Sequence, residues 1–175
     1  LLDSLVFSNC PISQALSKSG GGALTMANCR IQDNSGGVHG LGGYFIAGSV
    51  LMTNCVVAGN TAGTYNQSGF GIYSSGANLQ LVDCLFSNNH GHAWGTRTAR
   101  GVGLYFKNGT LIAVRTDFID NKGGANNGGG GAGVYVENTA GKTASFSNCV
   151  FRGNEALFGQ AGATGYGGAM WLNMT

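Results

Sequence analysis

The feature that most constrains this chain is a six-residue motif that recurs six times along its 175 residues. The motif reads as Cys, Thr or Ser, any residue, an apolar residue, any two residues and Asn. Its copies occupy residues 4–9, 29–34, 55–60, 84–89, 116–121 and 149–154. Regular internal similarity at this spacing is typical of repeat architectures, in which each unit packs only against its neighbours.

Two further patterns alternate with the first. One or two glycines precede apolar residues at 21–24, 42–45, 71–73, 103–105, 133–135 and 167–170. Before most copies of the first motif, apolar residues stand two apart, as in the pairs Val50 and Met52, Leu79 and Leu81, Leu111 and Ala113, and Ala144 and Phe146. A period of two predicts strands.

The alternation slips by one residue just before each cysteine. Asn28, Asn54, Asp83 and Asn148 stand at these positions. Asn and Asp tolerate the left-handed backbone conformation better than other non-glycine residues. We therefore expect a corner that joins two short strands in each repeat.

Each unit thus contains a strand, a corner, a strand, a loop, glycine and a third strand. Leucine-rich repeats would show a helical period, which is absent, and a propeller blade needs about 40 residues. The sequence predicts an all-β chain, a right-handed parallel β-helix of about six coils with three short strands per coil. We expect one domain over residues 1–175. The chain has no initiator methionine, so we expect it to be a segment of a longer repeat-containing protein.

Equivalent positions of successive coils form ladders along a β-helix, because strands stack about 4.8 Å apart. An apolar ladder is expected inside, made of Val6, Ile31, Val57, Phe86, Phe118 and Phe151. A ladder of small residues should also point inward, made of Ser4, Cys29, Cys55, Cys84, Thr116 and Cys149. Since Thr and Ser replace Cys, this ladder is interpreted as packing, with the stacked thiols free. Cys10 falls outside it and is expected to pair beyond this segment.

The most regular ladder consists of asparagines: Asn9, Asn34, Asn60, Asn89, Asn121 and Asn154. Stacked amides at a turn can bond to one another and to backbone groups that the turn would leave unpaired. A position repeated in every coil is too uniform for a single site. We interpret it as structural.

These motifs resemble a known family. The pair F-x-x-N and G-G-A-[ILV] is the repeat signature of chlamydial polymorphic outer membrane proteins. The segments 86–89, 118–121, 151–154, 21–24 and 167–170 are similar to it. The resemblance covers essentially the whole chain and implies a β-helical passenger region, displayed at a cell surface, with adhesive activity.

Charge argues against several partners. Charged residues make up 9% of the chain and the net charge is +2, so no basic patch predicts nucleic acid or an anionic membrane. No apolar run approaches the roughly 18 residues of a membrane span. A weakly charged surface associates with copies of itself or with neighbouring coils unless glycans cover it. Sequons at Asn66, Asn108 and Asn173 are candidate N-glycosylation sites.

The seven acidic residues are the candidates for glycosidase chemistry, which needs a close pair of acids. Asp33 and Asp120 share a ladder position but lie three coils apart, about 14 Å, too far for a glycosidase pair. Asp117 and Asp120 lie in one coil near basic residues, and a solvated salt-bridged edge is the favoured interpretation. We expect no catalytic residue, no metal and no cofactor.

Aromatic residues suggest binding instead. Trp94 lies in a loop that also holds His90 and His92, where contact with a glycan or a neighbouring chain is plausible. The third strand carries one aromatic ladder: Phe45, Tyr73, Tyr105 and Tyr135, with Leu24 and Met170 at its ends. Facing outward it would bind sugar rings or a protein, and facing inward it would be core. Because both faces of this strand are apolar, we favour burial, under a neighbouring subunit.

The leading functional hypothesis is a non-catalytic extracellular or cell-surface protein, structural or adhesive, whose coils could stack end to end into a fibre. The first alternative is a carbohydrate-active enzyme like pectate lyases and polygalacturonases, which share the fold. A fold alone is a weak argument for an activity. The second alternative is a passive glycan-binding module that uses Trp94 or the tyrosines.

Overall fold

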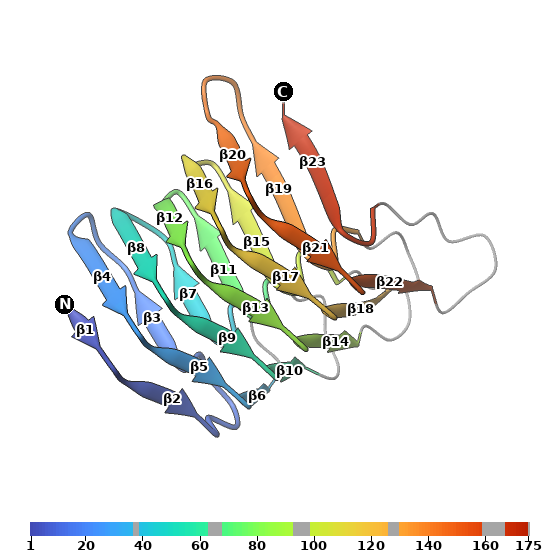
Figure 1. The fold of residues 1–175 in the computed structure, drawn as a ribbon, viewed down its shortest axis with the longest axis horizontal. Helices are drawn as coiled ribbons and strands as arrows, with labels where there is room; N and C mark the ends of the chain where they lie inside the picture. Colours follow the sequence, from blue (N-terminus) through green and yellow to red (C-terminus); the bar gives the residue numbers. More distant parts are fainter. Residues whose placement is uncertain (37–38, 63–67, 93–98, 126–129, 159–166, 175) are drawn as a thin grey trace.

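The computed structural model describes residues 1–36, 39–62, 68–92, 99–125, 130–158 and 167–174. Its strands wind around one long axis, coil after coil, from the N-terminal to the C-terminal end (Figure 1). The coils build four sheets, which we call sheets A to D. Every strand pair is parallel.

Sheets A and B supply the first two strands of each coil. Sheet A contains β1 (Leu2–Asp3), β4 (Ala23–Ala27), β8 (Ser49–Thr53), β12 (Asn78–Val82), β16 (Leu111–Val114) and β20 (Ala144–Ser147). Sheet B contains β2 (Val6–Ser8), β5 (Arg30–Gln32), β9 (Val56–Ala58), β13 (Leu85–Ser87), β17 (Asp117–Ile119) and β21 (Val150–Arg152).

Sheets D and C complete the coil. Sheet D contains β6 (Ser35–Gly36), β10 (Thr61–Ala62), β14 (His90–His92), β18 (Lys122–Ala125) and β22 (Glu155–Phe158). Sheet C contains β3 (Leu16–Lys18), β7 (Gly43–Phe45), β11 (Ile72–Ser75), β15 (Leu104–Lys107), β19 (Val134–Asn138) and β23 (Met170–Met174).

The predicted all-β parallel β-helix is confirmed, and two details differ. Most coils have four strands, because the short strands of sheet D follow the asparagine ladder where a loop was expected. Four coils of four strands each lie between the first and the last coil and have a neighbouring coil on both sides. The number of such complete inner coils is therefore slightly smaller than the six coils predicted.

The predicted corner between sheets A and B is confirmed. Asn28, Asn54, Asp83 and Asn148 have φ between 51° and 54°, and Arg115 takes the same place with φ 46°. A second corner joins sheets B and D, where Asp33, Asn88 and Asp120 also have positive φ and Gly59 and Gly153 substitute for them. Left-handed residues at both corners let each coil turn sharply between short strands.

The core fills the space between the sheets. Sheet A contributes the predicted apolar pairs to the core, including Val50 and Met52. Sheet B contributes the predicted apolar ladder, which begins at Ile31 and ends at Phe151. The rings of Phe86, Phe118 and Phe151 stack with centroids 5.0 Å apart. Rung-to-rung stacking therefore repeats the same contact along the whole core.

The predicted register of the first coil is wrong by one residue. Phe7, not Val6, pairs with Ile31, and Val6 is 60% exposed. Ser4 and Asn9 occupy the two corners, with φ 54° and 57°. The ladder positions of this coil are occupied by Leu5, Phe7 and Cys10, each one residue later than predicted.

The predicted third strand of the first coil is also wrong. Residues 21–24 lead into β4 of sheet A, where Leu24 pairs with Val50. The sheet C strand of the first coil is β3, which has no glycine pair before it and aligns with β7. Among the described residues, no helix is long and apolar enough to span a membrane.

Candidate functional site

The asparagine ladder runs through five coils at the start of sheet D. Asn34, Asn60, Asn89 and Asn121 are completely buried, and Asn154 is half-buried at the last coil. In each of the first four, the side-chain amide donates to the Oδ1 atom of the next asparagine at 2.8 to 2.9 Å. Each also donates to a carbonyl of the preceding coil, as Asn89 Nδ2 does to Val57 at 3.0 Å. The ladder thus satisfies backbone groups that the corner removes from the sheets.

Cys10 occupies the ladder position of the first coil. Its backbone N–H donates to Asn34 Oδ1 at 3.1 Å, and its carbonyl accepts from Ser35. The prediction that Asn9 belongs to the asparagine ladder is therefore wrong. Cys10 stands in that ladder and not in the ladder of small residues, outside which it was expected. The Cys10 thiol bonds weakly to the Ser8 carbonyl, at 3.8 Å.

The glycine motif packs directly against this ladder. In four coils it reads Gly-x-Gly, and a Cβ atom on the second glycine would stand 3.0 to 3.3 Å from a ladder amide, as at Gly103 beside Asn121. The first glycine has positive φ, for example 62° at Gly69 and 53° at Gly101. The two sequence motifs therefore repeat together because one packs on the other.

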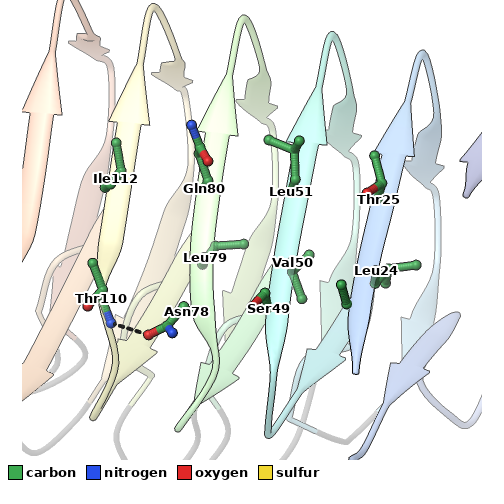
Figure 2. Close-up of a pocket in the computed structure, with 11 residues that line it drawn as sticks. Leu24, Thr25, Ser49, Val50, Leu51, Asn78, Leu79, Gln80, Thr110 and Ile112 are labelled. Atoms are coloured by element: carbon green, nitrogen blue, oxygen red, sulfur yellow. Dashed lines mark hydrogen bonds between the residues drawn. The ribbon is translucent and has the colours of Figure 1, made fainter. Parts of the chain in front are cut away.

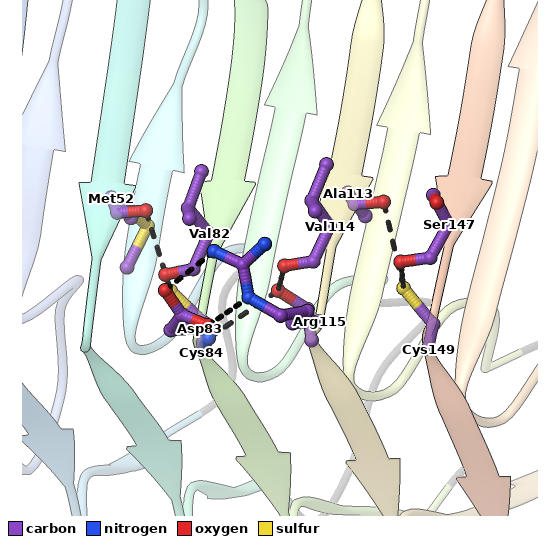
Figure 3. A network of polar contacts seen from close by, with 10 residues as sticks. Met52, Val82, Asp83, Cys84, Ala113, Val114, Arg115, Ser147 and Cys149 are labelled. Carbon is purple, nitrogen blue, oxygen red and sulfur yellow. Dashed lines mark hydrogen bonds and ion pairs between the residues drawn. The ribbon is translucent and has the colours of Figure 1, made fainter.

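The cysteine ladder is a line of donors as well as small residues. Each thiol bonds to the carbonyl two residues earlier, and Cys84 Sγ also reaches Met52 O of the preceding coil at 3.4 Å (Figure 3). Thr116 makes the same bond to Val114 O at 3.2 Å. Thr replaces Cys here because both side chains donate, which the packing interpretation missed.

All five thiols are free in this structure. Cys84 is nearly completely buried. A hydrogen bond with Cys55 and burial raise the pKa of Cys84, so this thiol stays protonated at neutral pH. A protonated buried thiol is a structural donor and a poor nucleophile.

An aromatic column stands on the outer side of sheet C. Its members are Tyr44, Tyr73, Tyr105, Tyr135 and Trp171, whose neighbouring ring centroids lie 4.4 to 5.2 Å apart with planes within 24°. Phe45 points into the core, so placing it and Leu24 in this ladder was wrong, and Tyr44 and Trp171 were missed. Met170 pairs with Val134, one position away from the column.

The column faces away from the core and is still covered. Tyr105 and Tyr135 are only 6% and 4% exposed. Their faces are used by the neighbouring rings, the Arg100 guanidinium lies 5.3 Å from the Tyr135 ring, and the positive-φ glycines pack close to the column backbone. The favoured burial is thus observed for Tyr105 and Tyr135, where contacts within the chain provide it, whereas Tyr73 is half-buried.

Polar groups fix the column from the side. Tyr105 OH donates to Glu137 Oε2 at 2.7 Å, and Lys107 Nζ lies 3.3 Å from Glu137 Oε1. Burial and this carboxylate raise the pKa of Tyr105, while the bond from Tyr105 lowers the pKa of Glu137. Near Tyr73, His39 Nδ1 accepts from the Ser68 backbone at 2.9 Å, and burial lowers the His39 pKa.

Within the described part of the chain, three ion pairs join neighbouring coils on the outside. Arg115 forks onto Asp83 at the corner between sheets A and B, with distances of 2.6 and 2.9 Å (Figure 3). Lys107 pairs with Glu137 on sheet C. Lys122 lies 3.5 Å from Glu155 on sheet D. Each pair connects one coil to the next, in the same direction as the ladders.

The candidate acids do not converge. Asp117 lies in sheet B, paired on either side with Leu85 and Val150. Asp120 is exposed at the next corner, where Gly153 approaches it from the following coil. Among the described residues, no three His, Cys, Asp or Glu side chains form a group that would hold a metal.

Sheet A carries a shallow hollow on its outer face, with a volume of about 220 Å³. It lies between two rows of outward side chains that cross β4, β8, β12 and β16 (Figure 2). One row contains Ala23, Ser49, Asn78 and Thr110, and the other contains Thr25, Leu51, Gln80 and Ile112. Sequence analysis did not single out any of these residues.

Other predicted site residues fall elsewhere. Asn108 lies at the expected turn between β15 and β16, with φ 55° and a buried Oδ1 that has no partner among the described residues. Asn173 is exposed on β23. Asn66 and Trp94 lie outside the described residues.

Comparison with known proteins agrees with this geometry. The family model described as "Right handed beta helix region" matches residues 3–175. The chain belongs to this family. No curated protein and no solved structure matches the sequence. The match supports a β-helix repeat in general, and the resemblance to the chlamydial repeats stays a prediction. Right-handed β-helix regions occur in enzymes and in non-enzymes, so the family does not decide the activity.

Proposed function

We propose that this right-handed β-helix is a non-catalytic scaffold of an extracellular surface protein, structural and adhesive in role. One observation carries the proposal: polar and charged side chains are used between coils. The asparagine ladder, the ladder of thiols and Thr116, and the three described ion pairs all link one rung to the next: Cys84 N–H donates to Thr116 Oγ1, and Cys84 Sγ donates to Met52 O of the preceding coil. Side chains that are bonded between coils stabilise the solenoid, and they are not available to act as general acids or bases.

The resemblance to the chlamydial F-x-x-N and G-G-A repeats supports a surface location. So does the small number of charged residues, 9%, which suits a glycosylated surface. Asn108 and Asn173 are the described candidates for glycan attachment. Mass spectrometry of the native protein tests this. Glycan mass on either residue supports an extracellular location, and unmodified residues from a glycosylating source contradict it.

A carbohydrate-active enzyme is the alternative. The experiment is a time course with neutral polysaccharides and polyuronides, for the wild type and for Asp117→Ala and Asp120→Ala. The proposal predicts no shortened products from any of them. Product formation by the wild type that either substitution abolishes would overturn it.

Association of copies is part of the proposed structural role. Only 9% of the residues are charged, and a weakly charged surface favours association with further copies. Light scattering over a concentration series tests this. Growth in mass with concentration supports end-to-end stacking, and a monomer at all concentrations contradicts it.

A further inference from the structure

We propose that two copies of this chain associate side by side through the outer face of sheet B, in a closed, antiparallel dimer. The inference deepens the association of copies in the proposed function, on which it rests, by naming the surface and the arrangement of the two partners. The order of apolar and charged side chains along this face supports the arrangement.

Sheet B presents two outward rows of side chains. Its six strands lie side by side along the solenoid, and the middle residue of each strand packs in the core (Figure 1). The register of the strands gives the first outward row, in the order of the coils: Val6, Arg30, Val56, Leu85, Asp117 and Val150. Large apolar side chains that face outward in one row form a candidate contact surface.

Two opposite charges stand in this row without a partner. Within the described part of the chain, neither the Arg30 nor the Asp117 side chain makes a hydrogen bond or an ion pair, whereas the three ion pairs observed all join adjacent coils. Arg30 and Asp117 stand three rungs apart, about 14 Å between their backbones at the usual strand spacing, so they do not reach each other. A second molecule can supply both counter-charges.

A two-fold axis brings these counter-charges into place. An axis that runs parallel to the strands, between the rungs of Val56 and Leu85, turns the face onto itself with the coils in reverse order. Arg30, one rung before Val56, then faces Asp117 of the second copy, one rung after Leu85, and the same pair forms again on the other side of the axis. At the centre, Val56 faces Leu85 of the second copy. Two ion pairs thus flank an apolar centre, which is the self-complementary pattern that a two-fold interface requires.

A two-fold axis along the solenoid would also place the face on itself, but it does not pair the charges. It keeps the order of the coils and sets the first row against the second. The second row is Ser8, Gln32, Ala58, Ser87, Ile119 and Arg152. Arg30 would then face Gln32, and Asp117 would face Ile119, where a carboxylate loses hydration without gaining a counter-charge. Charge therefore selects the antiparallel arrangement.

The rim and the size of the face limit the strength of the dimer. Asp33 and Asp120 of the two copies come to the same side, but both residues stand at the corner where the chain turns from sheet B into sheet D, outside the two rows. Both are exposed, so solvent and salt screen their repulsion. Six rungs span about 24 Å, and each strand is three residues long, so the contact is small and belongs with weak, transient interfaces.

Sedimentation equilibrium of the intact chain, from about 10 μM to about 1 mM, measures the association. The proposal predicts a mass that rises from 17.8 kDa and levels off at twice that value. It also predicts a dissociation constant that increases with salt, because two ion pairs hold the contact. A mass of one chain at every concentration would overturn the dimer.

Charge reversals locate the contact. Arg30→Glu and Asp117→Arg each replace two attractions by two repulsions, so each variant alone should dimerise at least ~10-fold more weakly than the wild type. In a 1:1 mixture of the two variants, opposite charges meet again at both pairs, and the affinity should recover to within ~5-fold of the wild type. Lys142→Glu makes the same charge change as Arg30→Glu on an exposed residue between β19 and β20, and it should change the affinity by less than ~2-fold. Unchanged affinity in the single variants, or no recovery in the mixture while all variants are folded by circular dichroism, would refute the arrangement.

The outcomes separate this surface from the proposed function. A mass that grows beyond the dimer and does not respond to the charge reversals supports end-to-end stacking and overturns the face. A dimer that follows the charge reversals, together with shortened sugars in the polysaccharide time course, supports the face and overturns the scaffold role. A monomer at every concentration overturns the face and the proposed association of copies, and the non-catalytic role is then decided by the polysaccharide time course.

Discussion

The centre of the asparagine ladder should carry a large share of the stability of the coils around it. Asn89 is completely buried and makes four side-chain hydrogen bonds: two donated by Nδ2, to Asn121 and Val57, and two accepted by Oδ1 from Asn60. Asn89→Ala leaves the Val57 carbonyl without this donor and two Asn60 donors without their acceptor. At about 1 to 3 kcal/mol for each of these three buried unsatisfied groups, the free energy of unfolding should fall by at least about 3 kcal/mol.

Urea unfolding followed by circular dichroism measures this loss. The control is Asn78→Ala, because Asn78 is exposed and its side chain accepts a single bond; the expected loss there is about 0.5 kcal/mol or less. Asn154→Ala, at the half-buried end of the ladder, should give an intermediate value. If Asn89→Ala costs no more than Asn78→Ala, the ladder does not stabilise the solenoid and the reasoning is refuted.

Three further predictions concern the glycine motif, the donor ladder and the aromatic column. Gly101→Ala should cost about 2 kcal/mol or more in urea unfolding, because its φ is positive and the added Cβ would collide with the Leu104 carbonyl; an unchanged midpoint would contradict this. Thr116→Val should cost about 1 to 2 kcal/mol because the Val114 carbonyl loses its donor, whereas Thr116→Cys keeps a donor and should cost less, and equal costs would count against the donor role. The folded state raises the pKa of Tyr105, so the contribution of Tyr105 to stability is complete below the unfolded tyrosine pKa of about 10 and is lost as the pH rises above it. The free energy of unfolding measured against pH should therefore fall less at alkaline pH in Tyr105→Phe than in the wild type, and identical curves would contradict this.

The sequence predicted the fold and most of the register because each coil repeats the same roles. Where the corner and the ladder use different residue types, as at Asp33 and Asn34 or at Asp120 and Asn121, the motif could be placed correctly. In the first coil Asn9 has the residue type expected in the asparagine ladder but stands at a corner. Ser4 has a residue type expected in the ladder of small residues and stands at the corner one strand earlier. Asparagine suits both a left-handed corner and an amide ladder, so the residue type alone could not separate the two roles.

Other features lay beyond the patterns. The strands of sheet D are two to four residues long, too short for a period to appear. Tyr44 and Phe45 are adjacent aromatics, so alternation could not tell which one faces out, although aligning 134–136 with 170–172 would have added Trp171 to the column. The hollow on sheet A depends on which neutral side chains stand in adjacent rungs, and this requires the register.

The most direct test of the scaffold proposal is a prolonged incubation of the intact protein with neutral and acidic polysaccharides, followed by mass spectrometry of the sugars. The proposal predicts that every polysaccharide is recovered at its original length. Shortened or unsaturated sugars that appear with the wild type and disappear with Asp117→Ala or Asp120→Ala would contradict it.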